Sequence, residues 1–201
     1  MSVLQTESVT AIVQRALGLA ESANRFDSLE DDTHEAREGR LRYDIRRRAV
    51  LEALDWNFAR RRVLGARVDA PATPDAQPYA YALPSKPLRI RGVHSGGVSA
   101  SWSRENVIYA SLTDAQIIYT IDEQNPVLFA PVFTSALEFL LAADFAMIFP
   151  RSVNRSNIML KNFRDTMRDA DEMEGQERSD DCAYETGGWI DAIEMPYGVR
   201  I

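Results

Sequence analysis

The densest apolar stretch of the chain runs from Pro131 to Phe149, and its apolar residues recur every three or four positions. That spacing is typical of one face of a helix. Further apolar residues fill most of the other positions, and the two charges, Glu138 and Asp144, argue against a membrane span. Pro131 suits a first helical turn, and Pro150 ends the helix. The pattern therefore predicts a helix at the centre of the core.

Three further segments have apolar residues at helical spacing: Val3–Ala23, Thr33–Phe58 and Asn154–Glu174. Thr6 or Ser8 can cap the first, because a hydroxyl oxygen accepts a hydrogen bond from a backbone N–H of the first turn. Together with the central helix, these segments predict two N-terminal and two C-terminal helices. In the second segment, the apolar residues that we expect to face the core are Ala36, Leu41, Ile45, Ala49, Val50, Ala53, Leu54 and Trp56.

The pattern changes between the two helical pairs. Asp69–Pro78 is a proline-rich connector, and Tyr79–Asp122 then contains short β-branched and aromatic runs with polar breaks between them. Ser95, Gly96 and Gly97 predict a turn. We expect a small antiparallel sheet or sandwich of four or five strands here.

The predicted fold class is α+β and mainly α. It is a four-helix bundle with an inserted small antiparallel β-sheet and an extended C-terminal tail, in one structural domain. Its expected parts are the N-terminal helical pair (1–68), the β-insertion (69–124), the C-terminal helical pair (125–174) and an acidic tail (175–201).

Composition narrows the class of protein. The chain of 201 residues is 45% apolar and 26% charged, as in ordinary soluble proteins. Its single cysteine excludes an intramolecular disulfide and fits a reducing compartment, and we see no signal-peptide pattern. The net charge of -7 is uneven, because residues 131–201 hold 7 Lys/Arg against 13 Asp/Glu, a net of -6. The C-terminal end should therefore behave differently from the rest.

Residues that carry common enzymatic chemistry are sparse. Gly-x-Ser-x-Gly and P-loop patterns are absent. His34 and His94 lie far apart with no ligand-spaced neighbour, which disfavours zinc. Acidic neighbours make Cys182 a poor nucleophile. Glu138 and Asp144 are candidate paired carboxylates, but nothing in the sequence sets such a pair across a cleft. We expect no enzymatic activity, no metal and no cofactor.

Arginines in and after the second helix are candidate contacts with another protein. Acidic residues are interleaved with them, since residues 1–70 hold 12 Lys/Arg and 12 Asp/Glu. Three interpretations stay open: a solvated, salt-bridged helix face, ion pairs between subunits, and contacts with nucleic-acid phosphates. The candidates are Arg40, Arg46, Arg47, Arg48, Arg60, Arg61 and Arg62.

The C-terminal tail combines strong acidity with large apolar residues. Residues 165–194 hold 11 Asp/Glu against 2 Lys/Arg. A disordered tail usually lacks large apolar residues, so a segment that docks on a surface is indicated. The surface belongs either to another subunit or to the same domain. The candidate contact residues are Trp189, Ile190, Ile193 and Tyr197.

Three motifs follow one another along the chain. Leu54–Arg62 contains a W-x-F-A helix end, Tyr79–Ile90 contains Y-x-Y-x-L-P and then L-R-I, and Phe129–Leu137 contains F-x-P-x-F-x-x-A-L. Together they resemble the head-to-tail adaptor proteins of short-tailed phages, the tail tubular protein A family. Asn162–Ala170 resembles that family's last helix before the tail. Lys86-Pro87 departs from the family, which more often has Asp-Cys there; the resemblance covers most of residues 3–175.

The resemblance implies a structural protein of the virion. Such adaptors form a ring, typically a dodecamer, that joins the portal to the tail nozzle and leaves a channel for DNA. Implied partners are the portal ring, the nozzle protein and further copies of the chain, with DNA passing without sequence-specific binding and with no membrane. Assembly is implied in the host cytoplasm. The alternatives are an envelope glycan hydrolase carried in a phage tail, or a generic cytosolic interaction domain.

Overall fold

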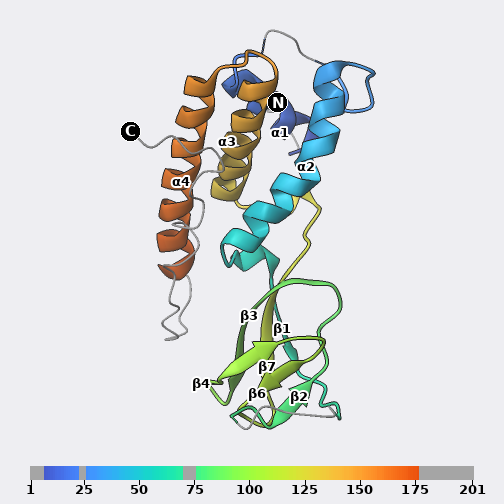
Figure 1. The fold of residues 1–201 in the computed structure, drawn as a ribbon, viewed down its shortest axis with the longest axis vertical. Helices are drawn as coiled ribbons and strands as arrows, with labels where there is room; N and C mark the ends of the chain where they lie inside the picture. Colours follow the sequence, from blue (N-terminus) through green and yellow to red (C-terminus); the bar gives the residue numbers. More distant parts are fainter. Residues whose placement is uncertain (1–6, 23–25, 70–75, 177–201) are drawn as a thin grey trace, which may run out of the picture.

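The computed structural model describes residues 7–22, 26–69 and 76–176. Its helices lie at one end of the molecule and its strands at the other (Figure 1). Helix α2 runs toward the strands, so its C-terminal end forms the junction between the two ends. The helices are α1 Val9–Leu19, α2 His34–Ala53, α3 Pro131–Ile148 and α4 Val153–Gln176, with 3-10 turns η1 Asn57–Ala59 and η2 Pro126–Leu128.

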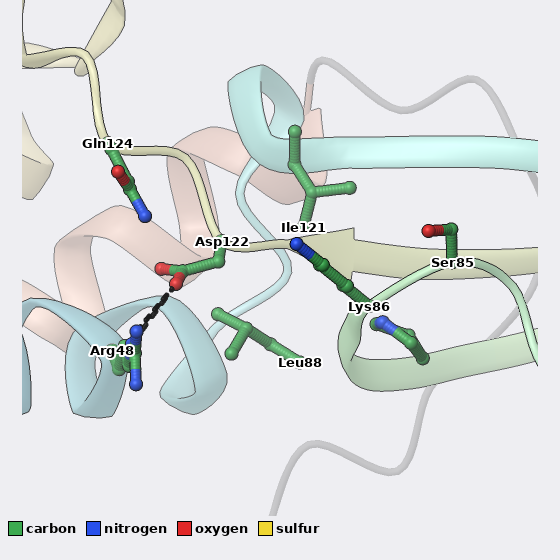
Figure 2. A pocket seen from close by; sticks show the side chains of 8 residues that line it. Arg48, Ser85, Lys86, Leu88, Ile121, Asp122 and Gln124 are labelled. Atoms are coloured by element: carbon green, nitrogen blue, oxygen red, sulfur yellow. Dashed lines mark hydrogen bonds and ion pairs between the residues drawn. The ribbon is translucent and has the colours of Figure 1, made fainter.

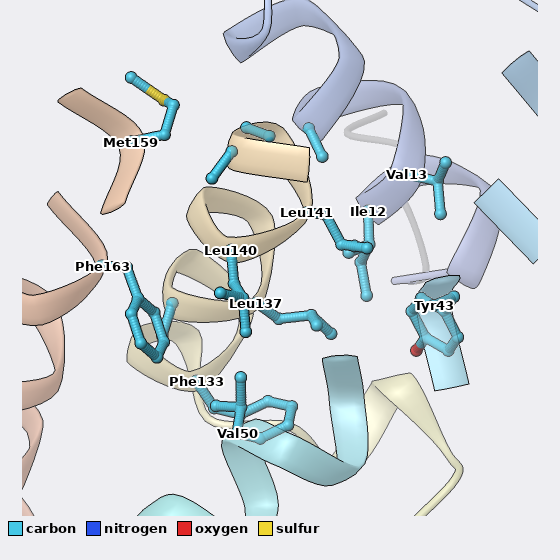
Figure 3. Close-up of a cluster of buried hydrophobic side chains, with 14 of the residues drawn as sticks. Ile12, Val13, Tyr43, Val50, Phe133, Leu137, Leu140, Leu141, Met159 and Phe163 are labelled. Carbon is cyan, nitrogen blue, oxygen red and sulfur yellow. The ribbon is translucent and has the colours of Figure 1, made fainter. Parts of the chain in front are cut away.

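Helix α3 lies at the centre of the helical end, as its pattern predicted. The other three helices all pack against it. Phe133, Leu137 and Leu141 are fully buried along its length (Figure 3). By length and composition α3 is apolar enough to cross a membrane; in this fold its apolar surface faces the other helices.

The two N-terminal helices begin at residues that the sequence indicated. Ser8 caps α1 by accepting from the N–H of Ala11 at 3.1 Å, and Thr33 caps α2 by accepting from the N–H of Ala36 at 3.2 Å. Each such cap contributes about 1 kcal/mol. Helix α1 ends at Leu19, short of the predicted Ala23, which lies outside the described residues.

The described strands form two antiparallel sheets. The first has the strand order β1-β7-β3-β4, and the second has the order β2-β6-β5. Their apolar side chains enclose a second core that includes Tyr81, Val93, Ile108 and Ile117. The strands are β1 Arg60–Leu64, β2 Tyr79–Tyr81, β3 Pro87–Ser95, β4 Val98–Ser99, β5 Trp102–Arg104, β6 Ile108–Ala110 and β7 Gln116–Ile121.

The predicted turn is present between β3 and β4. Gly96 and Gly97 have φ angles of 56° and 83°. Positive φ at both central residues is what a tight hairpin requires, and glycine adopts it without a steric penalty.

The predicted fold class is wrong: the chain does not form a mainly α four-helix bundle with a small inserted sheet. It has a mixed fold in which four helices and seven strands are present among the described residues. One reason is strand β1. Its residues, Arg60–Leu64, show no alternation of apolar and polar residues, and the strand forms by pairing with β7. The other is the second core, which gives the two sheets a hydrophobic interior of their own, separate from that of the helices.

The core face predicted for α2 is also wrong in part. Leu41 and Ile45 are 59% and 66% exposed, whereas Arg47 is 1% exposed. The buried side of α2 instead carries Tyr43 and Val50. A helix that buries positions 43, 47 and 50 must turn positions 41 and 45 to the other side. Apolar character alone therefore did not decide which face is inside.

Candidate interaction sites

Two of the candidate arginines of α2 bind neighbouring elements of the same chain. Arg46 donates two hydrogen bonds to the carboxylate of Asp144 in α3, from Nε at 2.6 Å and from Nη2 at 2.7 Å. Arg40 donates to the main-chain carbonyls of Leu29 and Asp31 in the loop before α2. These contacts fix α2 against α3 and against its own preceding loop.

Arg47 is the buried centre of the junction between α2 and the sheets. Its Nη1 donates to Asp122 Oδ1 at 2.6 Å and to the carbonyl of Glu123 at 2.5 Å, and its Nη2 donates to Asp44 at 3.2 Å. Arg48 Nη2 lies 3.0 Å from the other oxygen of Asp122. Asp122 directly follows β7, so both arginines fasten α2 to the first sheet.

The charge of Asp122 is stabilised by these contacts. Burial acts to raise the pKa of Asp122, but the hydrogen bond from Arg47 and the charges of Arg47 and Arg48 outweigh burial and lower the pKa below its ordinary value. The carboxylate therefore stays ionised and holds the two arginines in place.

Arg91 of β3 joins the same elements from the sheet side. It donates to the carbonyls of Leu51 and Leu54 at 2.8 and 2.6 Å and to Thr120 Oγ1 at 2.8 Å. Carbonyls at a helix C-terminus lack partners within the helix and carry partial negative charge, so a buried guanidinium stabilises them. Sequence reasoning did not single out Arg91; its signal was a charge inside the apolar run Leu88–Val93.

Residues of two of the resemblance motifs form one aromatic cluster at this junction. Trp56 and Phe58 follow α2, and Phe129 and Phe133 lie at the start of α3. The ring centroids of Trp56 and Phe133 are 5.1 Å apart, and Phe58 lies 5.1 Å from Phe133 and 5.7 Å from Phe129. Such pairs contribute about 0.5–1.5 kcal/mol each beyond their area burial.

The remaining motif reaches the same junction from β3. Leu88 packs against the helical core, and Arg89 donates to the carbonyl of Glu52 at 2.9 Å. Two motifs and the Leu88–Ile90 part of the third, which are far apart in the sequence, thus meet where helices and sheets join. The Tyr79–Tyr81 part of that third motif lies instead in β2, and Tyr81 belongs to the second core.

The second arginine cluster, Arg60–Arg62, lies in β1 at an edge of the first sheet. Arg60 Nε is 3.6 Å from Asp55 Oδ2, and Arg61 donates to the carbonyls of Phe58 and Arg60 at 3.0 and 2.8 Å. The side chains of Arg61 and Arg62 are exposed.

The outer face of α2 carries an unexpected feature, which we call the α2 stripe. It consists of Arg37, Leu41, Ile45 and Arg48, which follow at steps of four, four and three residues and so lie on one face. Leu41 and Ile45 are 59% and 66% exposed. Adjacent exposed apolar side chains between arginines are typical of a protein-binding surface.

Helix α4 has an acidic outer face. It consists of Asp165, Asp169, Glu172 and Met173, all exposed, with Arg168 among them. Met173 is 57% exposed. Helices α2 and α4 flank α3 from different sides (Figure 1). The α2 stripe and the acidic face of α4 therefore lie on different sides of the molecule.

A shallow hollow of about 550 Å³ opens beside the junction (Figure 2). Its lining includes one carboxylate, Asp122, which pairs with Arg48 as Figure 2 shows. Glycoside hydrolysis uses two facing carboxylates, so this hollow does not supply that pair. The lining residues are Arg48, Ser85, Lys86, Pro87, Leu88, Ile121, Asp122 and Gln124.

The two carboxylates of α3 that the sequence offered as a pair are held by separate arginines. Glu138 accepts from Arg15 Nε at 2.6 Å, while Asp144 binds Arg46. Burial raises the pKa of Glu138 although Arg15 acts to lower it. In the described ranges, no group of three or more His, Cys, Asp or Glu could hold a metal ion.

The candidate residues Trp189, Ile190, Ile193 and Tyr197 lie outside the described residues. No protein-family model matches the chain, and no curated protein matches it.

Proposed function

We propose that this chain is a structural virion protein: a ring-forming head-to-tail adaptor that joins the portal to the tail nozzle and leaves a channel for DNA. The observation that carries the proposal is the meeting, at one junction, of two resemblance motifs and the Leu88–Ile90 part of the third. Trp56, Phe58, Phe129 and Phe133 form its aromatic cluster, and Leu88 packs beside them on the helical core. The residues that support the resemblance are thus residues that hold helices and sheets together.

A rigid junction suits a subunit that bridges two larger assemblies. Arg47, Arg48 and Arg91 connect the end of α2 to β3 and to the end of β7, and the side chains of Arg47 and Arg91 are only 1% and 8% exposed. Contacts of this kind hold the helices and the sheets in one arrangement. That property is what a connector under a filled head requires.

The two outer helices offer complementary surfaces for a cyclic assembly. The α2 stripe presents Leu41 and Ile45 between two exposed arginines, which also pair with Asp32 and Asp122 of the same chain, and α4 presents Met173 among carboxylates. Because these surfaces lie on different sides of α3, one copy's α2 can meet the next copy's α4 head to tail. Contacts of that heterologous kind generate a ring when the rotation closes.

Size-exclusion chromatography with light scattering tests the proposal. The full chain is run alone and with the portal ring of the same phage, and we expect it to move into the portal peak. Leu41→Asp with Ile45→Asp should lower the number of copies on the portal ring, seen as a lower mass of the complex, because two charges then replace the apolar part of the contact between neighbouring copies. The matched control is Val98→Asp with Val127→Asp, which changes residues 60% and 57% exposed elsewhere and should join normally.

A wild-type chain that ignores the portal ring would overturn the adaptor proposal. If the stripe variant assembles on the portal ring as well as the control does, the adaptor proposal stands, but the α2 stripe is not part of the interface. Far-ultraviolet circular dichroism should give the same spectrum for all three proteins, since the four substituted residues are exposed.

A further inference from the structure

Strand β1 leaves one edge of the first sheet uncovered by any other described strand. Within the described ranges it pairs with β7 alone. Val63 and Leu64 are 40% and 66% exposed although they point to opposite faces of the sheet. Neither face is therefore covered at this edge. An edge strand with exposed apolar side chains is a template for a further strand.

The end of the described chain lies beside the start of this edge. Glu174, in the last turn of α4, accepts a hydrogen bond from the N–H of Asn57 at 2.8 Å and is 7% exposed. Asn57 precedes β1 by three residues. The last turn of α4, which leads into residues 177–201, therefore contacts η1, the turn directly before the uncovered strand.

Charge favours the same meeting. Strand β1 contains three arginines and no acidic residue. Residues 177–201 carry six carboxylates against Arg178 and Arg200, a net of -4. They also contain the apolar residues Trp189, Ile190 and Ile193. An acidic segment with apolar residues complements an arginine-rich edge that exposes Val63 and Leu64.

We propose that residues 177–201 of the same chain dock along β1 and cover this edge of the first sheet. The tether is short, which raises the local concentration of the segment at β1 above that of any second copy. The inference concerns the free subunit and does not depend on the adaptor function. The sequence alone left open whether the acidic tail docks on its own domain or on another subunit. This proposal assigns it to its own domain.

The single cysteine of the chain, Cys182, provides the test. From the Glu174–Asn57 hydrogen bond, eight residues lead to Cys182 and seven lead to Leu64. Gly175 and Gln176 still belong to α4, and Phe58 and Ala59 belong to η1, so the parts to compare are residues 177–182 and Arg60–Leu64. At up to about 3.3 Å per residue, residues 177–182 can reach as far as the five-residue strand extends. A Leu64→Cys variant of the full chain should therefore form a disulfide with Cys182 at monomer mass under mild oxidation.

The matched control is Val98→Cys in β4, at the opposite edge of the same sheet. Val98 is 60% exposed, close to the 66% of Leu64. It lies three strand spacings away, about 14 Å. We expect the Leu64→Cys disulfide to form about tenfold faster than the Val98→Cys one. High salt should slow the first reaction, because it screens the arginines of β1 from the carboxylates.

Two results would overturn the proposal. Equal rates of disulfide formation in the two variants would mean that the tail does not bind β1 in preference to β4. The arginines of β1 would then serve only to keep other strands from pairing with this edge. A disulfide-linked dimer in place of the monomer product would assign the tail to a second copy. Leu64→Cys combined with Cys182→Ser should give no disulfide, and matching melting temperatures establish that the variants are folded.

Discussion

At the residue scale, Tyr43 shows how burial without a partner shapes stability. The residue is 6% exposed, and among the described residues its hydroxyl has no hydrogen-bond partner. Burial raises the pKa of Tyr43 to about 12, against a lowering by Arg47. An unpaired buried hydroxyl carries its full desolvation cost, so removing it relieves a penalty.

Tyr43→Phe should therefore raise the free energy of unfolding by about 1 kcal/mol. Tyr81→Phe is the matched control, because the hydroxyl of Tyr81 donates to the carbonyl of Leu112 at 2.8 Å and the residue is 2% exposed. That change should lower the free energy of unfolding by about 1 kcal/mol. Urea unfolding at pH 7 measures both. Equal losses in the two variants would show that Tyr43 has a partner after all.

At the element scale, the passage of the chain from the first sheet to the second depends on Gly65. It directly follows β1, and its N–H donates to the carbonyl of Ala115 at 2.7 Å. A Cβ at this position would lie 2.7 Å from Tyr81 Cδ1 and 3.0 Å from the carbonyl oxygen of Ala115. The backbone oxygen cannot move without breaking the pairing of the strand.

Gly65→Ala should lower the free energy of unfolding by about 1–3 kcal/mol, the usual cost of overpacking. Gly18→Ala in α1 should have the opposite sign, with a gain of about 0.5–1 kcal/mol, because a Cβ there meets nothing within 4 Å and alanine favours the helix. Thermal unfolding of the two variants compares them directly. If Gly65→Ala left the free energy of unfolding unchanged, Tyr81 and Ala115 would move away from this position more easily than these distances imply.

The same scale shows what the sequence could and could not predict. Helix α3 and the turn at Gly96 and Gly97 follow from local pattern, and both were predicted. Strand β1 does not, because three consecutive arginines carry no alternation and become a strand only when β7 pairs with them. The core face of α2 failed for a related reason. Arg47 is buried because Asp122 compensates its charge, and a partner 75 positions away leaves no trace in a local pattern.

At the scale of the whole molecule, the candidate arginines differ in what they bind. Arg46 and Arg47 hold the fold together, so replacing them would unfold the junction before it tested an interface. The exposed α2 stripe separates those effects, because Leu41 and Ile45 contact solvent. The sequence pattern predicted both residues on the core-facing side of the helix, so it missed the surface that carries the proposed ring contact.

The junction should also set the acid stability of the chain. The folded pKa of Asp122 is lowered below its ordinary value of 3.8, so its ionisation stabilises the fold above that value, and this stability is lost as pH falls through the folded pKa. Asp122→Asn should lower the free energy of unfolding at pH 7 by about 2 kcal/mol, since it leaves buried Arg47 with Asp44 and the carbonyl of Glu123. Below that folded pKa the free energies of unfolding of the wild type and the variant should converge.

Urea unfolding from pH 7 down to the acid limit measures the difference between these two free energies. The control is Glu105→Gln at an exposed residue, which should leave the free energy of unfolding unchanged. A constant difference at all pH values would mean that Asp122 acts through its shape and not through its charge.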